Sequence, residues 1–274
     1  MSQTQNFMNW NNPGVALITG ASSGIGAEYA RSLSVQGFKT ILVARRKERL
    51  EDLAKVLEQE TGIKTTVLVA DLSKLEDIKK VTEVIKELNG LDVLVNNAGF
   101  GSRGYFENLP IDIINDMLFV HNIAPVHFSR VALPGMIKRN RGVIINVSSM
   151  AAFTVRPQSV MYCSTKGFLN RFSEVLQSEL HDTNLKVQAL CPGYTRTEIF
   201  NGKYLKDFDP PSIPEDLWMS TEEVVKISLE ALQGEQVVCI PGKVNQRFIE
   251  LYTDPILGKE SRENIINSRK IPRK

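Results

Sequence analysis

The stretch "GVALITGASSGIG", residues 14–26, decides the fold. Its first half is a continuous apolar run, and its second half holds three glycines before a helical pattern opens at "AEYARSL". Glycines let the backbone turn sharply and approach a ligand closely, while the free N–H groups and positive dipole end of the following helix favour a pyrophosphate. A strand, a glycine turn and a helix in this order therefore predict a dinucleotide site.

The spacing of the turn is G-x-x-x-G-x-G, and it lacks the Gly-Lys-Ser/Thr of a P-loop, so a nucleotide triphosphatase is disfavoured. The alternative is a tight turn that binds no ligand. The turn residues that we expect to bind the cofactor are Gly20, Ser22, Ser23, Gly24, Ile25 and Gly26.

Six further apolar runs follow the first at intervals long enough for helical crossovers: 39–45, 65–71, 91–97, 142–149, 186–193 and 236–242. Each is apolar continuously rather than in alternation, as expected for strands covered on both faces. The segment 47–62 has an apolar stripe at Leu50, Leu53, Ala54 and Leu57, and Gly62 follows as a helix stop. The pattern predicts an α/β fold: a doubly wound, seven-stranded parallel sheet of the Rossmann type with helices on both faces.

We expect a single domain, because no repeat, low-complexity tract or linker divides the chain. The predicted parts are an N-terminal extension (1–13), a Rossmann-type domain (14–242) with a substrate lid at about 194–220, and a C-terminal extension (243–274).

Composition excludes several classes of protein. Of 274 residues, 42% are hydrophobic and 23% charged, and the net charge of +2 gives no basic excess for nucleic acid. No run approaches the roughly 18 apolar residues of a membrane span, and the start "MSQTQNFMNWNN" has no basic region followed by an apolar core, so we expect a cytoplasmic protein. An odd number of cysteines, three, fits buried thiols in a reducing compartment, and three histidines without clustering predict no metal site.

The end of the second apolar run bears on the choice of dinucleotide. An acidic residue there would bind both ribose hydroxyls of NAD and repel a 2′-phosphate, but this chain has "LVARRKER" with Arg45 and Arg46. This favours NADP (NADPH) over NAD, and the Ser22 hydroxyl could add a bond to the phosphate. The alternative is that the two arginines simply begin a solvated helix.

One tyrosine differs from the others. Of the six tyrosines, only Tyr162 has a lysine four residues later, Lys166. Positions four apart share one face of an α-helix, so the ammonium can lie beside the phenol. A solvated surface pair is the alternative.

Several short motifs stand in order along the chain: the glycine turn, "NNAG" (96–99), Asn122, "NVSS" (146–149), "YCSTK" (162–166) and "PGYTRT" (192–197). Together they resemble the short-chain dehydrogenase/reductase family in its compact, single-domain form. The resemblance spans about residues 14–242, and it is most similar to the subgroup of ketoacyl reductases and hydroxysteroid dehydrogenases, which the motifs do not tell apart.

The resemblance implies four catalytic roles. Tyr162 would be the acid/base that exchanges a proton with the substrate oxygen, helped to ionise by the Lys166 ammonium and by an oxidised nicotinamide, since a phenol has a pKa of about 10. Lys166 would also hold the nicotinamide ribose. Ser149, thirteen residues before Tyr162, would bond the substrate oxygen, with Ser148 as its rival, and Asn122 would complete a proton relay by holding a water through its backbone.

The resemblance also implies further cofactor contacts. Asp71 and Leu72 would lie at the adenine, although Asp71 could instead cap the next helix. Asn97, Ala98 and Gly99 would line the adenosine ribose; a structural role is the alternative for Asn97. On the nicotinamide side the expected residues are Pro192, Gly193, Thr195 and Thr197.

The substrate is less well defined. The candidate lining is apolar and suggests a hydrophobic ketone or secondary alcohol, although a lid needs apolar packing too: Phe100, Met150, Phe153, Tyr194, Phe200, Tyr204, Phe208 and Trp218. Arg103 and Arg156 could meet a substrate anion or be surface charges. The predicted function is NADP(H)-dependent hydride transfer; a non-catalytic NADP(H) sensor or scaffold, and an epimerase or dehydratase, are the alternatives. By resemblance alone, a homodimer or homotetramer is expected.

Overall fold

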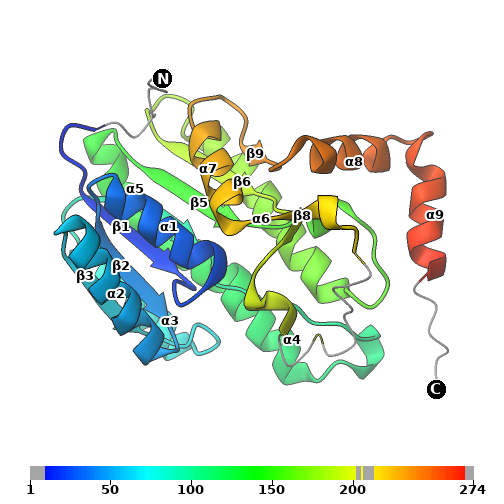
Figure 1. The fold of residues 1–274 in the computed structure, drawn as a ribbon, viewed down its shortest axis with the longest axis horizontal. Coiled ribbons are helices and arrows are strands. Elements are labelled where there is room, and N and C mark those ends of the chain that lie inside the picture. The colour runs from blue at the N-terminus through cyan, green and yellow to red at the C-terminus, as the bar shows by residue number, and fades with distance from the viewer. Residues whose placement is uncertain (1–9, 202–204, 206–212, 269–274) are drawn as a thin grey trace.

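The computed structural model describes residues 10–201, 205 and 213–268 of the chain. Its main sheet has seven parallel strands in the order β3-β2-β1-β4-β5-β6-β9 (Figure 1). The strands are β1 (Val15–Thr19), β2 (Lys39–Ala44), β3 (Thr65–Val69), β4 (Leu91–Asn96), β5 (Val143–Val147), β6 (Lys186–Leu190) and β9 (Val238–Cys239). All seven predicted strands are confirmed, although the last is only two residues long. The strand order reverses between β1 and β4, which is where a doubly wound sheet binds its ligand.

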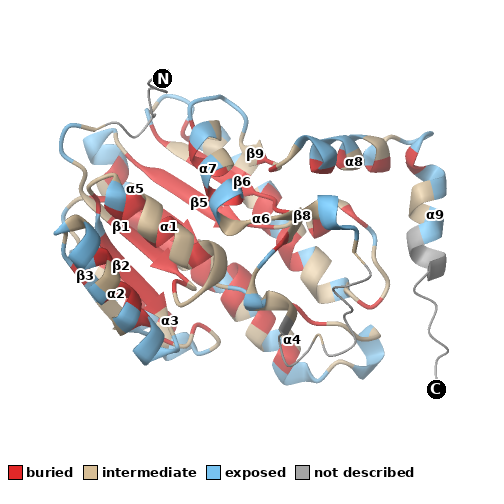
Figure 2. Cartoon of the chain, in the orientation of Figure 1, coloured by how far each residue is buried: buried red, intermediate tan, exposed pale blue. Residues whose placement is uncertain are grey.

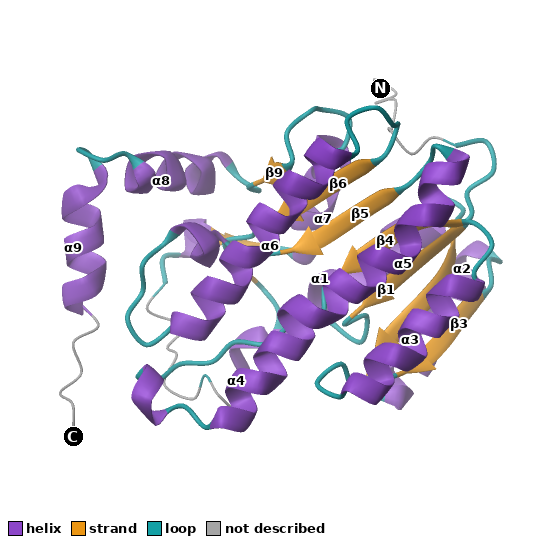
Figure 3. Ribbon diagram, turned by 180° about the vertical axis from the view of Figure 1, so that it is seen from behind, coloured by secondary structure: helices purple, strands orange, loops and turns teal. Residues whose placement is uncertain are grey.

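Helices cover both faces of the sheet (Figures 1 and 3). One face carries α1 (Gly24–Val35), α2 (Lys47–Thr61) and α7 (Thr221–Ala231); the other carries α3 (Leu75–Glu87), α5 (Ala124–Arg139) and α6 (Val160–Glu179). The core correspondingly forms two clusters, one including Tyr29, Leu50 and Val224, and the other including Ile78 and Phe128. Figure 2 shows the strands between them as the most buried layer.

The predicted helix over 47–62 is confirmed. α2 buries Leu50, Leu53, Ala54 and Leu57, and Gly62 follows it in the left-handed region with φ of 69°. Glycine adopts this conformation at no steric cost, which explains why the helix ends there.

Shorter elements fill the side of the molecule near the carboxyl ends of the strands. These are 3₁₀ helices η1 (Phe106–Asn108), η3 (Met150–Phe153), η4 (Glu198–Asn201) and η6 (Glu215–Leu217), helix α4 (Ile111–Leu118), the π-helical turn η2 (Phe119–Ile123), and the parallel pair β7 (Tyr194–Thr195) and β8 (Trp218–Met219). The predicted lid corresponds to the segment from β7 to β8. Tyr204 and Phe208 lie outside the described residues.

Two C-terminal helices follow the last strand: α8 (Lys243–Thr253) and α9 (Gly258–Ser268). α8 packs against η3, and the Tyr252 hydroxyl accepts a hydrogen bond of 2.8 Å from Val155 N. In Figure 1, α9 projects from the end of α8 away from the sheet. Part of the C-terminal extension thus contacts the segment that follows Ser149.

Two of the three cysteines, Cys191 and Cys239, are buried thiols, as predicted. Among the helices of the described residues, none is long and apolar enough to cross a membrane.

Candidate active site

The glycine turn joins β1 to α1 with two residues in the left-handed region, Gly20 (φ 66°) and Gly24 (φ 57°). Gly26 is required for a different reason: a Cβ there would lie 2.4 Å from Asn97 Nδ2 and 2.5 Å from the Gly20 carbonyl oxygen. No side chain fits at such distances. The sequence therefore places the start of α1 tightly against the carboxyl ends of β1 and β4.

Asn97 fixes this turn from the neighbouring strand. Its Nδ2 donates to the carbonyl oxygens of Thr19 (2.9 Å) and Gly20 (3.3 Å), while the Thr19 hydroxyl accepts from the backbone N–H groups of Asn97 and Ala98, both at 3.0 Å. The structural role expected for the Asn97 side chain is thus visible in its bonds. Gly99 lies further on, where an added Cβ would be 3.4 Å from Lys166 Nζ.

The first turn of α1 has the donors that a pyrophosphate needs. Its N-cap residue, Ser23, makes no side-chain capping bond, and the first turn contains no acidic residue. The N–H groups there have no intrahelical partner, and the dipole favours an anion. These residues fit the phosphates of a dinucleotide.

Arg46 crosses to the same turn. Its Nε and Nη2 donate to Ser22 Oγ at 3.1 and 2.9 Å, and Nη2 also donates to Ser23 Oγ at 2.7 Å. A guanidinium and two hydroxyls therefore gather at the end of β2, where the 2′-phosphate of NADP was predicted to bind. Arg45 is exposed, and no hydrogen bond or ion pair holds it within the described part of the chain. Of the two predicted arginines, only Arg46 is brought to the glycine turn.

Two residues of this cluster were missed by the sequence analysis. Glu198 Oε2 accepts from Arg46 Nη1 at 2.7 Å, and Arg49 Nη1 donates to Glu198 Oε1 and Oε2 at 2.6 and 2.8 Å. Hydrogen bonds from Arg46 and Arg49 lower the pKa of Glu198 to about 2. Arg49 lies one helical turn after Arg46, so the sequence could have predicted that it joins this cluster. Glu198 could not be predicted in this way, because it is 152 residues away from Arg46.

The two residues expected at the adenine behave differently. Asp71 Oδ1 accepts from the backbone and hydroxyl of Ser73, closing the turn after β3, whereas α3 begins only at Leu75 with Lys74 as N-cap. Asp71 is thus not the helix cap that was its alternative role. Leu72 is 5% exposed, and its side chain belongs to the core, so only its backbone is available for a ligand.

Tyr162 lies near the start of α6, partly exposed. Burial of its phenol raises the pKa, and this outweighs a hydrogen bond from Ser149 and the positive charge of Arg156, both of which lower it. Lys166 is not among the groups that shift this pKa in the structure, and the help expected from Lys166 together with an oxidised nicotinamide stays a prediction. The phenol is therefore protonated at neutral pH.

Lys166 lies one turn later in α6 and is 3% exposed. Its Nζ is 5.8 Å from the centroid of the Tyr162 ring and donates to the Val147 carbonyl oxygen at 2.7 Å. Burial lowers the pKa of Lys166 to about 8. The solvated surface pair, the alternative considered for Tyr162 and Lys166, is wrong for the lysine.

The two serines after β5 have different surroundings. Ser148 is 3% exposed and its hydroxyl donates to the Lys166 carbonyl oxygen at 2.8 Å. Ser149 is partly exposed, its hydroxyl accepts from Ala151 N at 3.1 Å, and it is near enough to the Tyr162 phenol to lower the pKa of that group. Ser149, rather than Ser148, is therefore the serine beside the phenol.

Asn122 lies in the π-helical turn η2, between α4 and α5, rather than in a regular helix. Its Nδ2 donates to the Thr165 carbonyl oxygen at 3.1 Å, so it contacts α6 beside Lys166. A π turn displaces backbone groups from the regular ladder and often marks a functional position. The residues Asn122, Ser149, Tyr162 and Lys166 come from three segments and meet at one end of the sheet.

His121, beside Asn122, is a further residue of the site that sequence reasoning did not find. It is fully buried; Phe100 N donates to its Nε2 at 3.1 Å, so the neutral ring carries its proton on Nδ1, which lies 2.9 Å from Thr165 Oγ1. Burial, and then the charge of Lys166, lower its pKa well below the ordinary value. Its ring also packs against Tyr162 at 5.9 Å between centroids. His121 therefore links the segment after β4 to α6.

The segment after β6 approaches the glycine turn from the other side. A Cβ at Gly24 would lie 3.0 Å from Thr197 Cγ2, which places Thr197 directly against the turn. Pro192 and Thr195 are buried, and Thr195 Oγ1 donates to the Gly193 carbonyl oxygen at 3.2 Å. A Cβ at Gly193 would lie 2.7 Å from Asn245 Nδ2, so this glycine allows α8 to approach closely.

The described part of the predicted lining is aromatic. Trp218 packs against Phe200 and Tyr194, with ring centroids 5.3 and 5.6 Å apart, and Phe100 lies 5.6 Å from His121. Arg156 has a buried Nε without a hydrogen-bond partner among the described residues.

A surface cavity of about 340 Å³ lies elsewhere, between α3 and α5, and contains none of the predicted site residues. The described residues include no cluster able to bind a metal ion.

A family model for short chain dehydrogenases matches residues 14–207. The chain belongs to the short-chain dehydrogenase family, and it is thereby an oxidoreductase of the class that acts on alcohol and ketone groups.

Among curated relatives, it is 35% identical over 233 residues to a very-long-chain 3-oxoacyl-CoA reductase from Anas platyrhynchos, covering 82% of this chain and 72% of the relative. It is 34% identical over 201 residues to a dehydrogenase/reductase SDR family protein 7-like from Drosophila melanogaster, covering 72% of this chain and 62% of that protein.

Solved structures match over nearly the whole chain. A short-chain dehydrogenase from Sphingobium yanoikuyae in complex with NADPH is 31% identical with a TM-score of 0.79, covering 96% of this chain and 98% of that one. A bulky-bulky ketone specific alcohol dehydrogenase from Comamonas testosteroni is 29% identical with a TM-score of 0.76, covering 97% and 98%.

Proposed function

We propose that this chain catalyses hydride transfer between NADP(H) and a ketone or secondary alcohol, with Tyr162 as the acid/base. The observation that carries the proposal is the position of the Tyr162 phenol: its ring centroid lies 5.8 Å from the Lys166 ammonium, and Ser149 is near enough to lower its pKa. These groups are on the same end of the sheet as the glycine turn, and Gly99 lies against Lys166.

In the direction of reduction, Tyr162 gives a proton to the carbonyl oxygen of the ketone. Its raised pKa keeps the phenol protonated at neutral pH, so the donor is present in the correct form. Ser149 donates a hydrogen bond to the same oxygen as negative charge develops there. The bound nicotinamide supplies the hydride. In the direction of oxidation, Tyr162 must act as a phenolate, so a nearby positive charge is needed to lower its pKa.

Lys166 and its neighbours hold the phenol and the cofactor in position. The Lys166 ammonium would bond the nicotinamide ribose hydroxyls. Its position is fixed by two hydrogen bonds: the ammonium donates to the Val147 carbonyl oxygen, and the Ser148 hydroxyl donates to the Lys166 carbonyl oxygen. Asn122 would hold a water near Lys166 through its backbone. Its place in a π turn, with its side chain on Thr165, supports this role.

The preference for NADP rests on the donors at the end of β2. Arg46, Ser22 and Ser23 form a cationic, hydroxyl-lined site at the glycine turn, with no acidic residue at the end of the strand to bind ribose hydroxyls. The related enzyme from Sphingobium yanoikuyae is described in complex with NADPH, which supports the same cofactor here.

The substrate class follows from the lining. The aromatic cluster of Tyr194, Phe200 and Trp218 supports a hydrophobic ketone, and two relatives carry names that agree: a 3-oxoacyl-CoA reductase and a bulky-bulky ketone specific alcohol dehydrogenase. The partly buried Arg156 would face a polar or anionic group of that substrate.

A screen of ketones with the purified chain, following nicotinamide absorbance with NADPH and NADH in parallel, tests the proposal. We expect turnover of at least one hydrophobic ketone, a preference for NADPH, and loss of at least ~100-fold in kcat for Tyr162→Phe. Tight binding of NADPH without turnover of any ketone would favour the sensor instead. A preference for NADH would contradict the assignment of Arg46.

We also propose that the chain forms a homodimer or homotetramer and that it is cytoplasmic. α6 exposes Phe168 (45%) and Val175 (50%), and such apolar side chains on a helix face are typical of a subunit interface. Light scattering of the purified chain would measure its mass, and a monomer at micromolar concentration would contradict the dimer.

A further inference from the structure

The cationic site at the end of β2 already holds an anion from the chain itself. Glu198 accepts from Arg46 Nη1 at 2.7 Å, and Arg49 Nη1 donates to both of its oxygens at 2.6 and 2.8 Å. Figure 1 shows how far the two partners lie apart in sequence: α2 is coloured blue and the segment before β8 is coloured yellow-green.

All three nitrogens of Arg46 are engaged in this arrangement. Nε and Nη2 donate to Ser22 and Ser23, and Nη1 donates to Glu198. A 2′-phosphate needs the same guanidinium, and it cannot share the site with a carboxylate that stays ionised because its pKa is held at about 2. Two anions on one guanidinium repel each other, so one must leave.

We propose that Glu198 is a specificity residue that competes with the 2′-phosphate of the cofactor for Arg46 and Arg49. This inference rests on the proposed use of NADP. Glu198 is exposed at the surface, where ion pairs contribute little, so a phosphate carrying up to two charges displaces it. Glu198 thereby weakens the binding of NADP(H), whereas NAD(H), which has no 2′-phosphate, leaves it in place.

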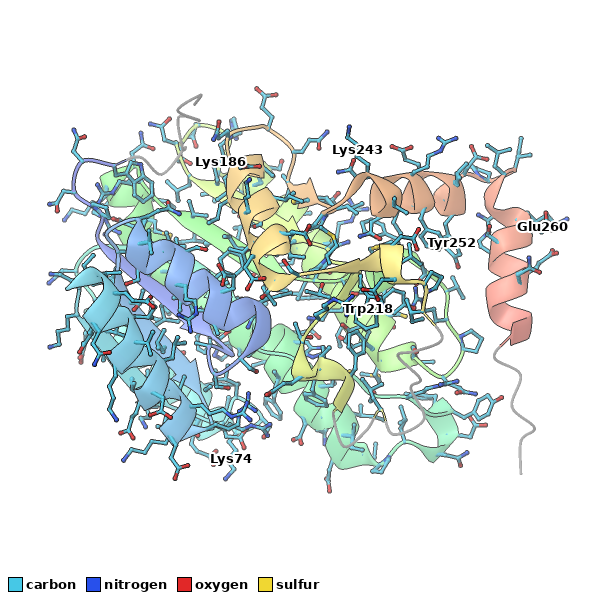
Figure 4. The ribbon with its side chains drawn as sticks, viewed as in Figure 1. Lys74, Lys186, Trp218, Lys243, Tyr252 and Glu260 are labelled. Atoms are coloured by element: carbon cyan, nitrogen blue, oxygen red, sulfur yellow. The ribbon has the colours of Figure 1, made fainter. Side chains whose placement is uncertain are left out.

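Displacement of Glu198 changes the segment that carries the aromatic lining. Glu198 begins η4, and Phe200, two residues later, packs against Trp218 at 5.3 Å and Tyr194 at 6.3 Å. Thr197 lies against Gly24 on the other side. Binding of the 2′-phosphate is therefore coupled to the environment of Trp218, which Figure 4 labels on β8.

The opposite effect of Glu198 is the alternative, because its ion pairs join η4 to α2 beside Ser23 of the glycine turn. As a clasp over the bound cofactor, it would strengthen binding rather than weaken it. The two roles predict opposite signs for the same substitution, which makes them distinguishable by one titration.

The experiment titrates the full chain with 2′,5′-ADP, which has the 2′-phosphate and no nicotinamide, and with 5′-ADP, which lacks that phosphate. We expect Glu198→Gln to tighten 2′,5′-ADP binding by about 3- to 10-fold, the effect of two exposed ion pairs, and to change 5′-ADP binding by less than about twofold. Glu198→Ala should do the same. Glu83→Gln, which removes an exposed ion pair with Lys86 on α3, is the matched control and should change neither.

A second readout follows the coupling. The chain has two tryptophans, so Trp10→Phe leaves Trp218 as the sole emitter. We expect 2′,5′-ADP to shift its emission and 5′-ADP not to, and Glu198→Gln to reproduce the shift without ligand.

Weaker or unchanged 2′,5′-ADP binding by Glu198→Gln would overturn the competition and leave the NADP(H) enzyme standing. Failure of the unaltered chain to bind either 2′,5′-ADP or NADPH would instead refute the proposed cofactor, and the inference with it.

Discussion

Burial moves both ionisable groups of the candidate active site toward their neutral forms. It raises the pKa of the Tyr162 phenol and lowers that of the Lys166 ammonium to about 8. The ordinary order of the two pKa values, 10 for the phenol and 10.5 for the ammonium, is therefore reversed, and the pKa of Lys166 lies below that of Tyr162. At neutral pH the site holds a protonated phenol and a lysine that is mostly, but not wholly, charged.

This arrangement predicts which group sets the alkaline limb of activity. Lysine is cationic below its pKa, so its charge is lost as pH rises through about 8, before the phenol ionises. With NADPH as the varied substrate and ketone saturating, we expect kcat/KM to be level from pH 6 to 7.5 and to fall above about 8. This ratio reports the groups of the free enzyme. A profile that stays level to pH 9.5 would contradict the role of Lys166.

His121 gives a second prediction at this scale. His121→Phe removes the acceptor of the part-buried Phe100 N–H and one hydrogen bond of the Thr165 hydroxyl, which still donates to the Met161 carbonyl oxygen, and we expect a cost of about 1–3 kcal/mol of unfolding free energy. Urea unfolding measures the change. His181→Phe is the control, because His181 is exposed, and it should change stability by less than about 0.5 kcal/mol. Because the pKa of His121 lies well below its ordinary value, its ring stays neutral, and we expect no loss of activity between pH 7 and 6 from this residue.

The sequence predicted these residues unequally. Tyr162 and Lys166 were found because a four-residue spacing is local and survives into the helix. The increase in the Tyr162 pKa on burial was not predicted, because it depends on how deeply packing buries the phenol. His121 was missed for a similar reason: its partners, Phe100 and Thr165, lie 21 and 44 residues away.

Among the elements, the strands and α2 were predictable from their apolar patterns. A continuous apolar run indicates a strand covered on both faces, and an apolar stripe indicates a helix covered on one face. The π turn η2 was not, since Phe119–Ile123 continues a helical pattern and the extra residue is accommodated by contacts with α6. Helix α8 was predicted only as an apolar segment. Its docking on η3 depends on Gly193, which is small enough to admit Asn245, a fact that becomes visible only in three dimensions.

The docking of α8 predicts an effect on substrate binding. The Tyr252 hydroxyl accepts from Val155 N, just after η3, so Tyr252→Phe frees the segment that follows Ser149 and Met150. Figure 4 labels Tyr252 on α8. We expect a loss of about 1 kcal/mol in unfolding free energy and a raised KM for the ketone, with the KM for NADPH unchanged. Thr253→Val removes an exposed hydroxyl from the same helix and should leave both KM values as they are. An unchanged ketone KM in Tyr252→Phe would show that α8 serves stability alone.

In the whole molecule, the candidate active site lies at the carboxyl ends of the parallel strands, and a cluster of charged residues that stabilises the fold lies at their amino ends. The predicted site residues gather where the parallel strands end. At the other edge, where β4 begins, the fully buried Asp92 accepts from Gly14 N at 2.9 Å and from Arg141, while Arg139 Nη2 lies 3.5 Å from its second oxygen. Arg141 also lies 4.8 Å from the centroid of the Trp10 ring, so the cluster joins the segment before β1 to the end of α5.

Substitution of Asp92 therefore tests whether the two edges are independent. Asp92→Asn keeps an acceptor for Gly14 N but removes the charge that two arginines face, and we expect unfolding free energy to fall by about 2–3 kcal/mol, with Tm lower by about 4–8 °C. Because none of the polar partners of Asp92 within the described residues is a site residue, kcat and both KM values at 25 °C should match those of the unaltered chain. Asp52→Asn, which breaks an exposed pair with Lys55, should change neither stability nor activity. A fall in kcat in step with the loss of stability would instead mean that the amino edge of β4 helps to set the positions of Asn97 and Gly99 at its other end, and that the sheet acts as one rigid unit.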